Sequence, residues 1–117
     1  MELTKISDKK INMSMVKGDT ASFNVAVEID GVDTPLVTGD TVYFTIKKST
    51  TATPKMLQKI ITSFTDGVAV IALIASDTSS LEVGTYVYDI QINFDTGDVK
   101  TIVEPSDFVL TGEVTYD

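Results

Sequence analysis

Apolar and polar residues alternate with a period of two along most of the chain, and this pattern predicts β-strands. Such alternation turns one face of a strand toward a core and leaves the other face in solvent. The pattern predicts strands at residues 11–15, 23–29, 42–46, 56–61, 68–74, 86–94, 99–103 and 108–114.

Turn residues separate these segments at intervals of about ten residues. Asp-Gly and Thr-Gly pairs favour tight hairpins. Pro105 is expected to end the strand at 99–103. Asp77 is expected to cap a single helical turn that reaches Leu81. About eight short strands in this arrangement predict one all-β domain over residues 1–117, an immunoglobulin-like antiparallel β-sandwich of about 7–9 strands. The alternation assigns to its core Phe23, Val25, Phe44, Ile46, Ile71, Leu73, Ile90, Ile92 and Phe108.

One segment, Leu81-Glu-Val-Gly-Thr-Tyr86, matches the pattern of a tyrosine corner. In such a corner a tyrosine near the start of a strand donates a hydrogen bond to the backbone just upstream. We therefore expect Tyr86 to make this bond, with Leu81 before it and Gly84 in a conformation that other residues resist.

The residue types that the chain lacks limit the reactions and ligands it can be expected to support. The chain has no Cys, His, Trp or Arg, and its net charge is −8. Without His or Cys it lacks the usual general base, thiol nucleophile and transition-metal ligands. Without Arg, and with a negative charge, it is poorly suited to nucleic acid. We expect a non-catalytic protein with no cofactor and no metal.

Charge is unevenly distributed between the two halves of the chain. Residues 1–59 contain eight Lys and seven acidic residues, whereas residues 60–117 contain one Lys and ten acidic residues. The basic side chains include a group that either keeps edge strands from pairing or contacts another protein. These candidate contact residues are Lys47, Lys48, Lys55 and Lys59. If these lysines contact the acidic half of another copy of the chain, we expect weak self-association that salt reduces.

The simplest register for the hairpin at Thr96-Gly97 pairs Phe94 with Val99 and Ile90 with Val103 on the core face. On the other face it sets Asp89 opposite Glu104. Two like charges directly opposite each other are unfavourable, so we expect a neighbouring Lys, a bound cation, or a bulge before Pro105 to relieve them.

Two further groups of side chains have candidate roles. Acids at turns occupy positions of the kind that calcium sites use, but their spacing favours a turn role; they are Asp30, Asp33, Asp95 and Asp98. Three tyrosines are candidates for stacking on sugars, although strand tyrosines usually pack in cores; they are Tyr43, Tyr88 and Tyr116. A carbohydrate-binding module is therefore the alternative to a structural or interaction module.

The segment that begins at Met1 has no apolar run of signal-peptide length, and no later segment has the length of a membrane span. We therefore expect the chain to be made in the cytoplasm and either kept there or assembled there into something larger.

Several short motifs follow one another in a recognisable order. They are Ile6-Ser-Asp-Lys-Lys, Val16-Lys-Gly-Asp-Thr20, Val37-Thr-Gly-Asp-Thr-Val-Tyr-Phe-Thr-Ile-Lys47, Asp77-Thr78, Gly84-Thr-Tyr-Val-Tyr-Asp-Ile90 and Thr96-Gly97. This order resembles small Ig-like proteins encoded in prophages of Gram-positive bacteria, and it is similar to the N-terminal domain of phage baseplate upper proteins. The resemblance implies an accessory role in a phage tail or baseplate. It also implies protein partners, either other tail components or further copies of the chain.

Overall fold

The computed structural model describes residues 3–6, 12–29 and 31–112. Its strands are β1 (Leu3–Ile6), β2 (Met13–Val16), β3 (Ala21–Ile29), β4 (Val32–Asp33), β5 (Thr41–Lys47), β6 (Leu57–Ile61), β7 (Ala69–Leu73), β8 (Gly84–Asn93) and β9 (Val99–Thr111). The one helix among these residues, α1 (Ala75–Thr78), is a single turn, so no described helix has the length and apolar character needed to cross a membrane.

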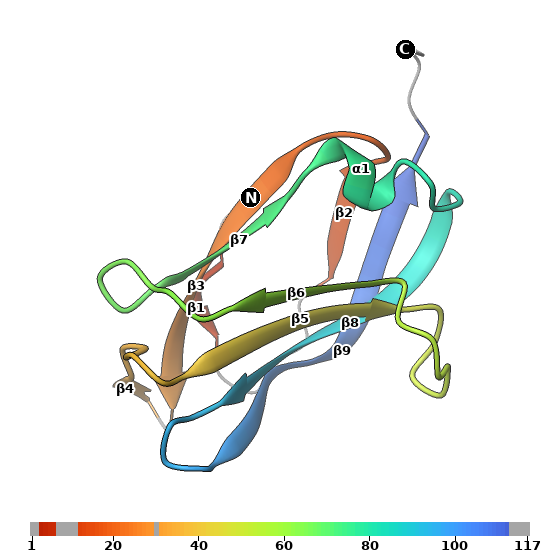
Figure 1. The fold of residues 1–117 in the computed structure, drawn as a ribbon. Helices are drawn as coiled ribbons and strands as arrows, with labels where there is room; N and C mark the ends of the chain where they lie inside the picture. Colours follow the sequence, from red (N-terminus) through yellow and green to blue (C-terminus); the bar gives the residue numbers. More distant parts are fainter. Residues whose placement is uncertain (1–2, 7–11, 30, 113–117) are drawn as a thin grey trace.

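The strands form two sheets (Figure 1). In one sheet β3 pairs with β1, β4 and β7, and the other has the order β2-β9-β8-β5-β6. The expectation of a purely antiparallel structure is wrong, because β1 runs parallel to β3 and β2 runs parallel to β9. Strand β1 was not predicted, since Leu3 and Ile6 are three residues apart and do not alternate with a period of two.

Both sheets contribute their inward-facing residues to one core. The nine residues that alternation assigned to the core each expose 2% or less of their surface. Phe23 of one sheet meets Phe44 of the other edge to face, with ring centroids 5.4 Å apart. Tyr88 and Phe108 extend this aromatic cluster, with their own centroids 6.3 Å apart. The prediction of a shared apolar core is therefore confirmed.

The hairpin between β8 and β9 differs from its predicted register. Phe94 donates its N–H to the carbonyl of Asp98, and Asn93 rather than Phe94 pairs with Val99. The turn places Gly97 at φ +99°, which is typical of a longer hairpin loop with a glycine bulge. This loop takes up one more residue than the simple turn assumed in the prediction, so the first pairs shift by one.

Two bulges on β9 change the pairing of β9 with β8 further along the hairpin. The first returns Ile90 to its predicted partner, and the second moves the pairing away from the predicted register by one residue. Ile90 pairs with Val103 as predicted, but register shifts lie on both sides of Ile90. One shift leaves Asp89 without a register partner on β9. Of the three expected ways to relieve its repulsion from Glu104, the structure has two: the bulge, and a neighbouring lysine, because the positive charge of Lys47 acts on Asp89. Pro105 does not end the strand, because a bulge does not need the ladder N–H that proline lacks. Strand β9 therefore continues and, with 13 residues, is longer than β8.

Candidate functional site

The outer face of the five-stranded sheet carries a row of polar side chains. Along β8 the inward residues alternate with Asp89, Gln91 and Asn93, which are half-buried on the outer face. Tyr43 of β5 is the register partner of Gln91, and Thr45 is the partner of Asp89. Residues far apart in the sequence are thus brought side by side by the pairing of β5 with β8.

Two adjoining hollows lie over this row, with volumes of about 300 Å³ and about 80 Å³. They share Thr45, Lys47 and Asp89, and together we call them the β5–β8 groove. The larger hollow is lined by Tyr43, Thr45, Lys47, Lys55, Gln58, Asp89, Gln91 and Asn93. The smaller is lined by Thr45, Lys47, Ser49, Thr50, Val87, Tyr88, Asp89 and Pro105.

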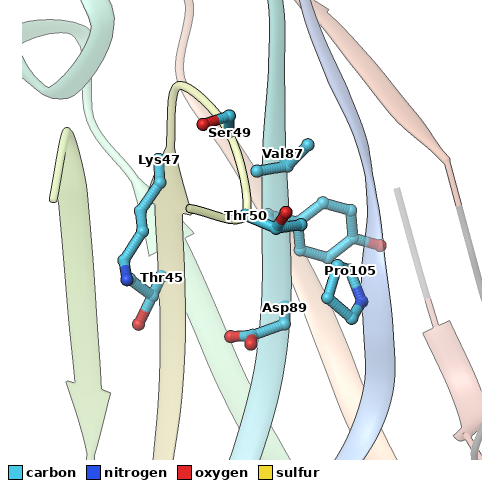
Figure 2. A pocket seen from close by; sticks show the side chains of 8 residues that line it. Thr45, Lys47, Ser49, Thr50, Val87, Asp89 and Pro105 are labelled. Carbon is cyan, nitrogen blue, oxygen red and sulfur yellow. The ribbon is translucent and has the colours of Figure 1, made fainter. Parts of the chain in front are cut away.

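Figure 2 shows how the smaller hollow is built. Thr45 and Lys47 project from β5, Val87 and Asp89 from the neighbouring β8, and Pro105 from the bulged part of β9. Ser49 and Thr50 belong to the loop after β5, and Figure 2 shows Ser49 at one end of the group and Thr50 nearer its middle. The bulge at Glu104 and Pro105 therefore shapes one wall of the groove.

Asp89 is a half-buried carboxylate that lines both hollows. Among the described residues no hydrogen bond or ion pair reaches its oxygens. Desolvation by burial raises its pKa, and the positive charge of Lys47 opposes that rise without cancelling it. A carboxylate that is desolvated but not hydrogen-bonded can accept hydrogen bonds from an incoming ligand.

Asn93, at the other end of the row, has a similar unsatisfied acceptor. Its Oδ1 is buried, and no donor within the described part of the chain reaches it. Leaving a buried acceptor unpaired costs about 1–3 kcal/mol. Such atoms are rare in native structures and mark places where a water or ligand supplies the missing bond.

The basic side of the groove is more fully paired. Lys55 Nζ donates to Gln58 Oε1 at 3.4 Å, and Gln58 Nε2 donates to Thr45 Oγ1 at 3.0 Å. This chain of contacts links the loop before β6 to the centre of β5. It holds Gln58 and Thr45 in place beside Asp89.

The four predicted contact lysines do not form one cluster. Lys47 and Lys55 line the groove and Lys48 is exposed nearby. Lys59 is the register partner of the core residue Phe44 and so lies on the opposite, inner face of the sheet. There its Nζ forms an ion pair with Asp77 Oδ2 at 2.8 Å.

Asp77 is not the N-cap of α1, as the sequence suggested. The N-cap is Ile74, and Asp77 is the third helical residue. The Asp77 carboxylate reaches back and accepts the N–H of Ile74 at 2.8 Å. Burial raises its pKa, but the hydrogen bonds from Lys59 and Ile74 outweigh that effect, and the net pKa is lowered.

The segment proposed as a tyrosine corner makes the expected contact. Tyr86 Oη donates to the carbonyl oxygen of Glu82 at 2.8 Å. Gly84 has φ +155°, and Leu81 packs half-buried against the core. These residues anchor the start of β8 and lie apart from the groove lining.

The three tyrosines proposed to stack on sugars lie in different parts of the chain. Tyr43 lines the groove. The ring of Tyr88 packs in the core against Phe44, with centroids 5.4 Å apart, and its surface is 1% exposed. Tyr116 lies outside the described residues. Asp30, one of the acids at turns, also lies outside the described residues. Within the described ranges no group of three or more acidic side chains is placed to hold a metal ion.

Sequence reasoning missed the polar neighbours of Asp89 in the groove. Gln58, Gln91 and Asn93 had no assigned role, although the alternation that put Ile90 and Ile92 in the core turned Gln91 and Asn93 outward. The missing information was the order of the strands, because only the pairing of β8 with β5 puts these amides beside Tyr43.

Comparisons with known proteins show a likeness to solved structures only. No family model matches the chain, and no curated protein matches it. Among solved structures, it is similar to the N-terminal domain of phage TP901-1 ORF48, at 14% sequence identity and a TM-score of 0.53. The match covers 97% of this chain and 99% of that one. At this identity the likeness is one of fold.

Proposed function

We propose that the chain is a non-catalytic structural or interaction module, an accessory component of a phage tail or baseplate, and that its two sheets form an immunoglobulin-like sandwich. The observation that carries the proposal is the fold likeness to a phage domain over nearly the whole of both chains. The order of turn and strand motifs, which resembles that of prophage Ig-like proteins, supports it independently.

The lining of the groove supports a role without catalysis. Hydrolysis of a glycoside ordinarily uses two carboxylates on either side of the bond, and the groove lining contains a single carboxylate, Asp89. The chain also has neither His nor Cys. Positioned polar groups of this kind are suited to binding.

The partners we propose are other tail proteins or further copies of the chain, with synthesis in the cytoplasm followed by incorporation into the particle. Lys48 and Lys55 are exposed on and beside the loop between β5 and β6, where a partner can reach them. Charges at such a rim affect the rate and specificity of association more than its strength.

Immuno-electron microscopy of induced phage particles tests this proposal. Antibodies against the purified chain are expected to label one end of the tail in particles purified on a density gradient. An antibody against the major capsid protein, which labels the head, is the control. If the chain remains in the unassembled fraction and is absent from purified particles, the proposed role is wrong.

A further inference from the structure

We propose that the β5–β8 groove binds a short saccharide, whose hydroxyl groups donate to Asp89 and Asn93 and one of whose rings packs against Tyr43. This inference goes beyond the proposed phage role and does not depend on it. It concerns the chemistry of one surface of the molecule, whatever assembly carries that surface.

The unsatisfied acceptors point to a ligand rich in donors. Asn93 Oδ1 is buried without a donor among the described residues. The Asn93 side chain lines the larger hollow, and a ligand there reaches this oxygen once the amide turns toward it. The Asp89 carboxylate is half-buried without a hydrogen bond in the same part of the chain. The two residues are four positions apart on one face of β8, which separates them by roughly 13 Å. A ligand that satisfies both must present donors at more than one place along its length.

Other ligand classes fit this surface less well. A simple anion would meet the negative charge of Asp89 at the centre of the groove. A metal ion would find one carboxylate with Lys47 beside it, and metal sites for hard cations use several oxygen ligands. An apolar side chain seated in the groove would desolvate Gln91 and Asn93 without pairing them. The hydroxyl groups of a sugar supply uncharged hydrogen-bond donors at several positions. The acceptors along the groove lack such donors.

The position of Tyr43 also suits a sugar. It is half-buried in the middle of β5, between Gln91 of β8 and Ile60 of β6 in the register of the sheet. A tyrosine ring in a polar groove offers an apolar face beside hydrogen-bonding groups. Sugar rings have the matching character, with C–H groups on their faces and hydroxyl groups around their edges.

The dimensions of the groove set the expected size and affinity of the ligand. Its larger hollow, about 300 Å³, lies at the lower end of the range of about 300–1,000 Å³ found for small-molecule sites. This is consistent with one or two sugar units. Because the groove lies on the outer face of a sheet and covers only part of a ligand, we expect dissociation constants of about 0.1–10 mM.

A titration followed by ¹⁵N-resolved NMR tests the inference. The probes are lactose, cellobiose, maltose, chitobiose and glucuronic acid, with inorganic phosphate as a probe for simple anion binding. At least one sugar is expected to cause saturable shifts in the amides of β5 and β8. Asn93→Ala and Tyr43→Ala are each expected to weaken this binding about tenfold or more, and Asp89→Asn about fivefold.

Asn24→Ala is the matched control for Asn93→Ala, since Asn24 is also a half-buried, outward-facing strand residue but lies on β3 in the other sheet. Its affinity should equal that of the unmodified chain. If Asn93→Ala does not fold, Asp89→Asn, which changes shape little, still gives the test. The inference is overturned if no sugar gives saturable shifts, if phosphate alone gives the same shifts, or if Asn24→Ala weakens binding as much as Asn93→Ala.

Discussion

Asp77 and Asp89 are two half-buried carboxylates, each with a lysine nearby, in contrasting surroundings. Asp77 forms an ion pair with Lys59 and accepts a backbone N–H, and its pKa is lowered. Asp89 has no such bonds within the described residues, and its pKa is raised. From these opposite directions we expect the first carboxylate to stabilise the fold and the second to oppose it. A side chain that is unfavourable for folding and lies in a groove is a good candidate for a binding role.

Removing Asp77 is expected to have the largest effect on stability. Asp77→Ala leaves the N–H of Ile74 and the charge of Lys59 without their partner, so the free energy of unfolding should fall by about 1–2 kcal/mol. The measurement is urea denaturation, with a lower midpoint and an unchanged slope. Lys59→Met, which removes only the ion pair, should give a smaller loss. Equal stability of Asp77→Ala and the unmodified chain would contradict this account.

The pH dependence of the Asp77 contribution follows from its lowered pKa. The folded state holds the ionised carboxylate more favourably than the unfolded chain does. The stabilisation is therefore complete above the ordinary value of 3.8 and is lost as pH falls through the lower folded pKa. The difference in stability between the unmodified chain and Asp77→Ala should accordingly narrow in acid.

The Tyr86 bond gives a reference for the size of these effects. Tyr86→Phe removes one donor to the Glu82 carbonyl and keeps the buried ring, so we expect a loss of about 1 kcal/mol. Chemical denaturation of the variant measures it. An unchanged midpoint would mean that the hydroxyl group does not hold the start of β8.

Asp89→Asn should change stability in the opposite direction. Replacing the desolvated charge with a neutral amide of the same shape is expected to increase the free energy of unfolding by a few tenths to about 1 kcal/mol. The partial exposure of the site limits the gain through solvent screening. Thermal unfolding at neutral pH measures the effect. A variant less stable than the unmodified chain would show that Asp89 helps to hold the fold.

The effects of the two carboxylates on stability can also be distinguished by their dependence on pH. Because the folded pKa of Asp89 is raised above its ordinary value of 3.8, its ionisation is unfavourable for folding above the folded pKa. That penalty disappears as pH falls through the folded pKa toward the unfolded value. The advantage of Asp89→Asn should therefore be full near neutral pH and vanish in acid. Asp77→Ala instead shows a disadvantage that vanishes in acid.

The sequence predicted the core far better than it predicted the groove. Alternation identified residues such as Phe44 and Ile90 because burial of one strand face requires that pattern whichever strands are neighbours. The groove depends on which strands are adjacent and on bulges near Asp89 and Pro105. Neither leaves a local signal of comparable strength, so Gln91 and Asn93 gained a role only once β8 was placed beside β5.

The smallest expected effect is self-association through charge. With Lys59 bound to Asp77 on the inner face, the exposed Lys48 and Lys55 are left to meet the acidic half of another copy. Each such contact is worth about 0–1 kcal/mol and is screened over about 10 Å at 0.1 M salt. Light scattering at high protein concentration should therefore show a modest rise in mean mass in low salt that disappears in high salt. Lys48→Glu combined with Lys55→Glu should remove the rise, whereas Lys59→Met should leave it unchanged. A monomer in both salt conditions would exclude self-association by charge and favour a different protein as the partner of these lysines.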